Sequence, residues 1–161
     1  MVIFDANILI SYATEDECTE RFYKLDTLIK ELVEKRRIIG IPAPAWAEFL
    51  AGSELAMPEI IKKFGGKRAI QILPFGEAEA VEAAEIERKF KRKPRGENQS
   101  NRTIVKYDRQ ILAIAITRNT EMLYTDDKRM AKEANILGVN VCDTDNLPLP
   151  PQRELNFNES K

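Results

Sequence analysis

Acidic residues follow two short apolar segments that lie far apart in the sequence. Asp5 comes directly after residues 1–4, and Asp126 and Asp127 come directly after residues 122–125. Short apolar segments of this kind are typical of strands in a parallel sheet, whose carboxyl ends open onto one common crevice. We therefore expect these strand-end acids to meet at one site.

A further acid, Asp108, interrupts the apolar face of an expected helix. It lies four residues after Ile104 and four before Leu112, and these spacings place all three residues on one side of a helix. A lone buried carboxylate is costly and normally neutralises or finds a partner. A structural role stays open, because the residue could lie near a helix N-terminus or pair with Lys106 or Arg109.

The other acids also have structural alternatives. Asp5 and Asp127 each precede an expected helix and could be N-caps, and Asp126 could fill that place instead of Asp127. Glu48 lies in the helix expected after the second strand, where an exposed glutamate is ordinary. The case for chemistry depends on these acids taken together.

A cluster of three or four carboxylates repels itself unless cations neutralise it. The chain has no histidine and only two cysteines, Cys18 and Cys142, without metal-ligand spacing. Hard oxygen ligands alone suit Mg²⁺ or Mn²⁺. Such a site hydrolyses phosphodiesters, because the metal activates water and stabilises charge on the attacking and leaving oxygens.

The composition sets limits on the other function classes. A chain of 161 residues with 43% hydrophobic residues predicts one folded domain, which we place at residues 1–146, with a tail at 147–161. A net charge of −1 excludes a protein that is basic throughout. The sequence shows neither a membrane span nor a basic leader, so the expectation is a cytoplasmic protein without membrane contact.

Strands alternate with helices along the chain, which predicts an α/β fold with a parallel sheet covered on both faces. The expected strands are residues 1–4, 38–41, 70–73, 122–125 and 139–141. The expected helices are residues 6–13, 19–35, 44–52, 60–64, 77–90, 103–117 and 128–137. The apolar helices around residues 22–33 and 46–50 are candidate partner surfaces, although core packing explains them better.

Four motifs in this order resemble the PIN-domain family and, within it, the VapC-type toxins of bacterial and archaeal toxin–antitoxin pairs. They are Phe-Asp-Ala-Asn at 4–7, Ala-Trp-Ala-Glu at 45–48, Tyr-Asp-Arg-Gln-Ile-Leu-Ala-Ile-Ala at 107–115 and Leu-Tyr-Thr-Asp-Asp at 123–127. The resemblance implies a PIN-like three-layer α/β/α sandwich around a five-stranded parallel sheet with strand order 3-2-1-4-5. It also implies an endoribonuclease that uses Mg²⁺ or Mn²⁺.

The resemblance assigns residues as well. It implies that Asp5, Glu48, Asp108 and Asp127 form the acidic quartet, with Asp5, Asp108, Asp127 and Asp126 as candidate metal ligands. Asn7 and Thr125 match polar residues that support the site. The implied partners are RNA, a small antitoxin protein and a second copy of the chain in a homodimer.

Two positions depart from the family pattern. The family's last motif often carries another acid two residues further on, followed by Phe, where this chain has Arg129 and Met130. The departure leaves the fourth acid open between Asp126 and Asp127, although the family's T-x-D spacing favours Asp127. The chain is also longer than a typical toxin of this kind.

A basic segment precedes the helix that carries Asp108. We expect it to form a loop over residues 91–102 and to hold RNA phosphates, unless it is only a solvated charged loop. Its candidate RNA-binding residues are Lys91, Arg92, Lys93, Arg95 and Arg102.

Three other functions compete with the nuclease. A non-catalytic PIN-like module that binds RNA or protein stays open. A phosphatase with Asp5 as nucleophile is less favoured, because Asn7 stands where such sites usually want a second Asp. A receiver domain is disfavoured because the third strand ends in Pro74 rather than in an Asp.

Overall fold

Five short parallel strands form one sheet at the centre of the molecule. The computed structural model describes residues 1–52, 69–90 and 99–149, with side chains in α6 described from residue 105 onward. The order across the sheet is β3-β2-β1-β4-β5, as the sequence resemblance implied, and each neighbouring pair is parallel. The strands are β1 (Val2–Phe4), β2 (Ile39–Pro42), β3 (Ile70–Leu73), β4 (Met122–Tyr124) and β5 (Val141–Cys142).

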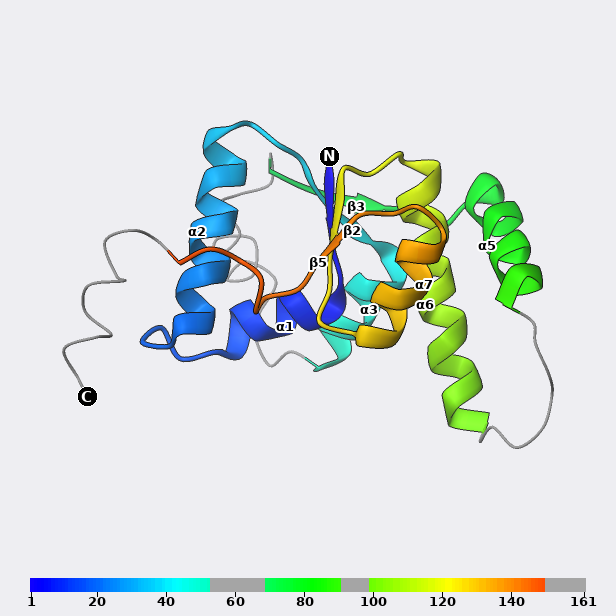
Figure 1. Ribbon diagram of the computed structural model, residues 1–161, viewed down its shortest axis with the longest axis horizontal. Coiled ribbons are helices and arrows are strands. Elements are labelled where there is room, and N and C mark those ends of the chain that lie inside the picture. The colour runs from blue at the N-terminus through cyan, green and yellow to red at the C-terminus, as the bar shows by residue number, and fades with distance from the viewer. Residues whose placement is uncertain (53–68, 91–98, 150–161) are drawn as a thin grey trace.

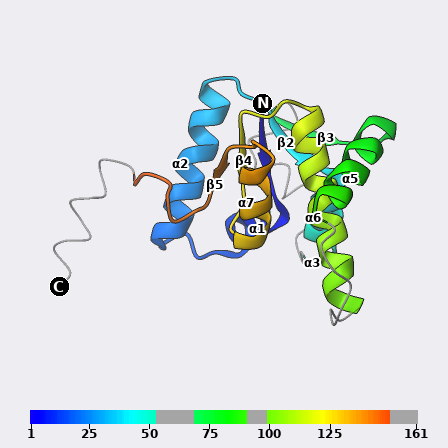
Figure 2. The same ribbon diagram turned by 45° about the vertical axis from the view of Figure 1, so that its right-hand side comes forward.

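Helices cover both faces of this sheet, which makes a three-layer α/β/α sandwich. Figure 1 shows α2 on one side of the strands and α5, α6 and α7 on the other. In the turned view of Figure 2, α5 and α6 stand side by side as a packed pair. The described helices are α1 (Ala6–Thr14), α2 (Glu20–Glu34), α3 (Ala43–Gly52), α5 (Glu77–Phe90), α6 (Gln99–Thr117) and α7 (Lys128–Ile136).

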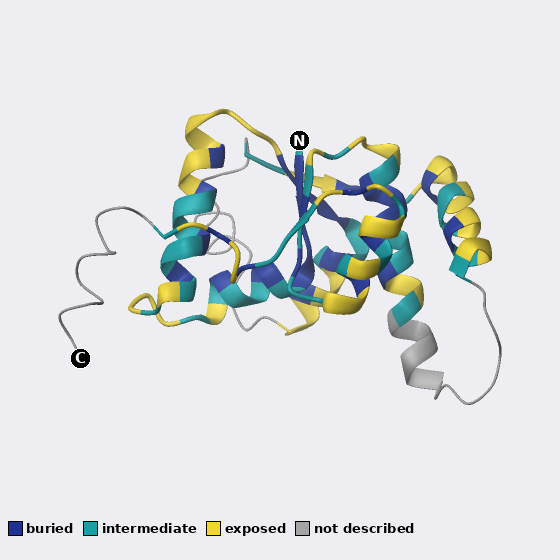
Figure 3. Cartoon of the chain, in the orientation of Figure 1, coloured by how far each residue is buried: buried dark blue, intermediate teal, exposed yellow. Residues whose placement is uncertain are grey.

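Side chains alternate between the two faces along β1, and each face has its own core. Phe4 packs with Leu9 and Leu25 in the layer under α1 and α2. Ile3 packs with Leu112 and Leu123 in the layer under α6 and α7. The buried residues in Figure 3 follow this division along the strands and the inner helix faces. Both faces of β1 are buried, which explains why the segment is apolar at every position.

The two helices considered as partner surfaces turn their apolar faces mainly to the core. In α2, Phe22, Leu25 and Ile29 are buried, and in α3, Phe49 is buried. Only the edges of these faces reach the surface, as at Leu50. Core packing therefore explains most of their apolar character.

The end of α7 shows why the fifth strand begins later than expected. Gly138 has a φ of 81°. Its N–H donates to Asn135 and the N–H of Val139 donates to Ala134, at 3.1 and 3.0 Å, which is the pattern of a Schellman motif. Val139 thus belongs to the helix end, and β5 covers Val141–Cys142 rather than residues 139–141.

Helix α6 and the expected C-terminal tail also differ from the bounds that the sequence predicted. Helix α6 begins at Gln99, four residues before the expected start at 103, because a polar composition does not distinguish a helix end from a loop. The short helix expected at 60–64 lies outside the described residues. Leu147, at the start of the expected tail, is buried in the core. None of the helices in the described ranges is long and apolar enough to span a membrane.

Candidate active site

Asp5 occupies the first position beyond β1 and is the N-cap of α1, as the sequence allowed, and its side chain is fixed by three donors. Its backbone N–H donates to the carbonyl oxygen of Tyr124 at 3.1 Å, so the pairing of β1 with β4 continues past the strand. Its Oδ1 accepts from the N–H of Ala6 at 2.7 Å. Its Oδ2 accepts from Asn7 Nδ2 at 2.7 Å and from Thr125 Oγ1 at 2.8 Å. The carboxylate is held in one orientation and is only 4% exposed.

Asn7 and Thr125 join the ends of β1 and β4. Asn7 Nδ2 lies 3.2 Å from Thr125 Oγ1, and Asn7 Oδ1 accepts from the backbone N–H of Asp126 at 3.1 Å. Thr125 Oγ1 also accepts from the backbone N–H of Asp127 at 3.1 Å. The two residues that the sequence suggested as supports therefore lie against Asp5 and brace the turn that carries the neighbouring acids.

The adjacent acids Asp126 and Asp127 have different surroundings. The carboxylate of Asp126 lies between α2 and the segment after β5, where Arg21 forms an ion pair with it. Its two oxygens also accept from the backbone N–H and the hydroxyl of Thr144, at 2.8 and 2.9 Å. Both oxygens of Asp126 therefore have partners on another part of the molecule.

Asp127 is the N-cap of α7 and uses only one oxygen for this role. Its Oδ1 accepts from the N–H groups of Arg129 and Met130, at 2.7 and 2.9 Å. In the described part of the chain Oδ2 has no hydrogen-bond partner. Asp127 can therefore cap the helix and still offer an oxygen to a ligand. This arrangement favours Asp127 over Asp126 as the fourth acid.

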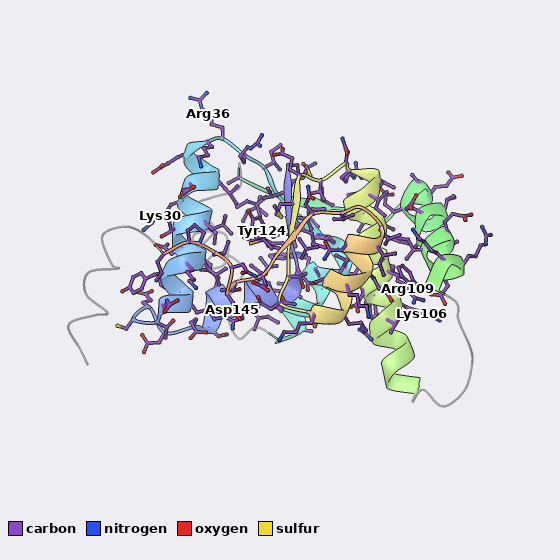
Figure 4. The ribbon with its side chains drawn as sticks, viewed as in Figure 1. Lys30, Arg36, Lys106, Arg109, Tyr124 and Asp145 are labelled. Carbon is purple, nitrogen blue, oxygen red and sulfur yellow. The ribbon has the colours of Figure 1, made fainter. Side chains whose placement is uncertain are left out.

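Asp108 is buried in α6, as its place on the apolar face predicted, and forms an ion pair with Arg129. The pair joins the middle of α6 to the first turn of α7. The paired role that the sequence left open is therefore present, but with another cation than expected, because Arg109 pairs with Glu87 and Glu133. Figure 4 shows Arg109 on α6, close to the helix α5 that carries Glu87. The other candidate, Lys106, is exposed.

Burial is the main influence on Asp5 and raises the pKa of its carboxyl from 3.8 to about 7. Hydrogen bonds from Thr125 and Ala6 oppose this rise, and the negative charges of Glu48 and Asp108 add to it. Glu48 itself is exposed on α3. Asp5, Glu48 and Asp108 therefore belong to one electrostatic cluster, although they lie on three separate elements.

Burial also raises the pKa of Asp108, from 3.8 to about 6. Arg129 opposes the rise, and the negative charges of Asp127 and Glu133 add to it. Asp127 is thus coupled to Asp108, as Asp108 is to Asp5. The four acids that the sequence resemblance selected act on one another through this chain of interactions.

The donor set suits a hard divalent cation. Asp5, Glu48, Asp108 and Asp127 supply carboxylate oxygens only, which Mg²⁺ and Mn²⁺ prefer. Within the described residues no three acids are close enough to chelate one ion as the side chains stand. Burial raises the pKa of both Asp5 and Asp108, and of the two only Asp108 has a positively charged partner within the described residues. A cation would compensate their negative charge, with Asp5, Asp108 and Asp127 as its nearest candidate ligands.

The candidate RNA-binding residues lie outside the described part. Lys91, Arg92, Lys93 and Arg95 fall within residues 91–98, and the side chain of Arg102 is likewise not described. They stay predictions.

Sequence reasoning missed three residues around the acids. Arg21 and Thr144 fix Asp126, and no local pattern in the sequence indicates that they approach it. Arg129 was visible as a departure from the family motif, but its pairing with Asp108 was not.

Comparisons with known proteins agree with this architecture. The family model described as PIN domain matches residues 2–135. The chain therefore belongs to the PIN domain family, whose members are generally nucleases and typically use divalent metal. A search of curated protein sequences gives no match.

Two solved structures show the same fold at low sequence identity. A chain of VapBC2 from Rickettsia felis, bound to a DNA fragment from its promoter, has a TM-score of 0.61 and 17% identity, covering 89% of this chain and 98% of that one. A chain of DNA-bound VapBC from Salmonella typhimurium has a TM-score of 0.58 and 19% identity, covering 89% and 97%.

Proposed function

We propose that this PIN domain is a metal-dependent endoribonuclease and acts as the toxin of a toxin–antitoxin pair. The observation that carries the nuclease proposal is the buried carboxylate of Asp5, which is held by neutral donors and faces the negative charges of Glu48 and Asp108. The N-cap role at α1 accounts for one of its hydrogen bonds, from Ala6, but it brings no positively charged side chain to offset the burial and the two acidic neighbours. Asp5 is thus ready to bind a cation.

Each residue of the site has a defined task in this proposal. Asn7 and Thr125 orient Asp5 by donating to its Oδ2, while its Oδ1 accepts one bond, from Ala6. Asp127 and the oxygen of Asp108 that Arg129 does not contact would be the further ligands of a bound ion, and Glu48 would add an exposed carboxylate. When bound, Mg²⁺ or Mn²⁺ lowers the pKa of a water molecule and stabilises the charge that develops on the phosphate.

RNA is the substrate class that the sequence resemblance favours. In the sequence the basic segment comes directly before α6, the helix that carries Asp108, and we propose that its cationic side chains contact the RNA phosphates. Phosphate contacts of this kind give affinity without sequence readout. The proposed residues are Lys91, Arg92, Lys93, Arg95 and Arg102.

A small antitoxin is the proposed protein partner. The support is the similarity of the fold to chains from two VapBC complexes, together with the motifs that resemble VapC-type toxins. A homodimer is proposed on the family resemblance alone. Purification of the chain together with the product of a neighbouring small gene, followed by size-exclusion chromatography with light scattering, tests both.

One observation favours a second candidate, a non-catalytic PIN-like binding module. Asp108 already has an ion-pair partner in Arg129, and an acid neutralised by the protein needs no metal. The phosphatase alternative receives no such support, because Asn7 donates a hydrogen bond to Asp5 and offers no second carboxylate.

Cleavage of a labelled single-stranded RNA in Mn²⁺ or Mg²⁺ separates the nuclease from the binding module. We expect the wild type to cleave, and Asp5→Asn and Asp108→Asn each to lose at least about 10²–10³-fold in rate. Glu79→Gln is the matched control, because Glu79 is also a buried helical acid with an arginine partner, Arg118. Equal cleavage by the wild type and both site variants would remove the quartet from the mechanism. RNA binding without cleavage in any metal would establish the binding module.

A further inference from the structure

Arg129 contacts two of the four acids, Asp127 and Asp108, from the first turn of α7. Its N–H donates to Oδ1 of Asp127 at 2.7 Å, so its backbone is fixed by one acid of the quartet. Its guanidinium reaches across to α6 and pairs with Oδ2 of a second acid, Asp108. The residue therefore joins two acids of the cluster, one through its backbone and the other through its side chain.

This guanidinium is the one cation that the described residues place on the quartet. Asp5, Glu48 and Asp127 form no ion pair within those ranges, and Arg21 pairs with Asp126 outside the cluster. The side chain of Arg129 is 43% exposed, whereas that of Asp108 is 13% exposed. Arg129 can therefore neutralise Asp108 and still present N–H donors to a molecule in solvent.

A fixed guanidinium changes what the site requires from metal ions. Nucleases with two ions hold them about 4 Å apart, bridged by shared carboxylates, so that both the attacking and the leaving oxygen are stabilised. An ion bound by Oδ2 of Asp108 would have to displace Arg129. The guanidinium is planar, keeps its charge at every working pH and binds phosphate through paired N–H donors. It can thus take the place of the second ion.

We propose that the site holds a single divalent ion per chain, on the side of Asp5, and that Arg129 serves as its second cation and contacts the phosphate of the substrate. This inference rests on the proposed nuclease function and makes it more specific.

The test is the number of Mn²⁺ ions bound per chain, measured by isothermal titration calorimetry and by electron paramagnetic resonance of free Mn²⁺. We expect one ion for the wild type and for Arg129→Lys, which keeps the charge. We expect two ions for Arg129→Gln, which frees Asp108. Arg118→Gln is the matched control: its partner Glu79 is also buried, and the two side chains are 37% and 7% exposed. This control should bind one ion.

The possible failures are distinguishable from one another. The inference would be overturned if the wild type bound two ions. It would also be overturned if Arg129→Gln bound one ion with unchanged affinity while its thermal unfolding stayed intact. Either result would leave the nuclease proposal in place. If Arg129→Gln does not fold, the number of ions bound by the wild type and by Arg129→Lys tests the inference. More than one ion per chain on either protein contradicts it. No Mn²⁺ on the folded wild type would overturn both this inference and the metal dependence of the proposed function.

Discussion

Two buried carboxylates in this molecule, Asp5 and Glu79, differ in how the fold compensates them. They are similarly hidden from solvent, at 4% and 6% exposed. Glu79 lies in the first turn of α5, where its Oε2 accepts from the N–H of Gly76 at 2.9 Å, as in a capping box. Its other oxygen meets the hydroxyl of Thr117 and the guanidinium of Arg118, each at 3.2 Å.

The partners of Glu79 favour its charged form. Its own backbone N–H and that of Gly76 hold the pKa of Glu79 below its usual range, and Thr117 and Arg118 contribute in the same direction. This carboxylate is part of the structure and needs nothing from outside the chain. It ties the start of α5 to the C-terminal end of α6.

Asp5 has three neutral donors, Ala6, Asn7 and Thr125, and no positively charged partner within the described residues. Burial dominates and raises the pKa of Asp5 to about 7, and its acidic neighbours Glu48 and Asp108 raise it further. The comparison teaches that burial alone does not mark a functional acid. A buried acid that the fold leaves uncompensated is the better indicator of a ligand site.

The largest expected effect is that of Asp5→Asn on RNA cleavage. The variant should lose at least about 10³-fold in kcat/KM, because the central ligand loses its charge. Its free energy of unfolding should not fall at neutral pH, since the amide keeps the shape and removes both the cost of a buried charge and the repulsion from Glu48 and Asp108. Cleavage kinetics and urea unfolding measure the two quantities. A large loss of stability would mean that Asp5, like Glu79, is mainly structural.

The adjacent acids provide a sharper version of the same contrast. Asp127→Asn should lose about 10²-fold in cleavage with little change in stability, because Asn caps a helix as well as Asp. Asp126→Asn should keep cleavage within a few-fold but lose about 1–2 kcal/mol, because Arg21 and Thr144 lose a charged partner. The reverse pattern in the same two assays would make Asp126 the fourth acid.

Glu79→Gln tests the structural side of the comparison. It should lower the melting temperature by at least about 3 °C, because Arg118 is left without its partner. Its cleavage rate should stay within about two-fold of the wild type, because Glu79 is not part of the acidic cluster. Differential scanning calorimetry and the RNA assay measure these effects. A loss of cleavage comparable to that of Asp5→Asn would contradict the division between the two sites.

The sequence predicted the strands, most helices and the positions of the four acids. Both faces of a parallel sheet are buried, so its strands are apolar at nearly every position. The sequence therefore indicated the short strands that Asp5 and Asp126–Asp127 follow. Asp108 was readable because it breaks an apolar face. The strand order came from the family resemblance, since periodicity alone does not order a sheet.

Other features depended on contacts between distant segments. The partners of Asp126, which favour Asp127 as the fourth acid, are Arg21 on α2 and Thr144 after β5, and both lie well away from it in sequence. The partner of Asp108 is on α7 rather than within one turn of α6, so helical spacing favoured the wrong cations. Pairings of this kind follow from how the helices pack and not from any local pattern.

A further expected effect is a pH dependence of stability in the metal-free protein. The carboxyl of Asp5 has a pKa of about 7 in the folded chain and 3.8 as its ordinary value, so between these limits the folded state binds more protons than the unfolded state. Its contribution therefore makes stability fall as the pH rises from about 4 to about 7, by at most about 1.4 kcal/mol per pH unit.

Asp108 has a pKa of about 6 and also makes stability fall as the pH rises, up to about pH 6. Glu79 has the opposite effect: its lowered pKa contributes stability that is lost as the pH falls below the ordinary value of 4.5.

Urea unfolding of the metal-free wild type and of Asp5→Asn across pH 4–8 isolates the contribution of Asp5. The wild type should lose stability relative to the variant as the pH rises, and Mn²⁺ should remove this difference at pH 8, because the bound cation stabilises the ionised carboxylate. Parallel curves for the two proteins would show that the fold already compensates Asp5 as fully as it compensates Glu79.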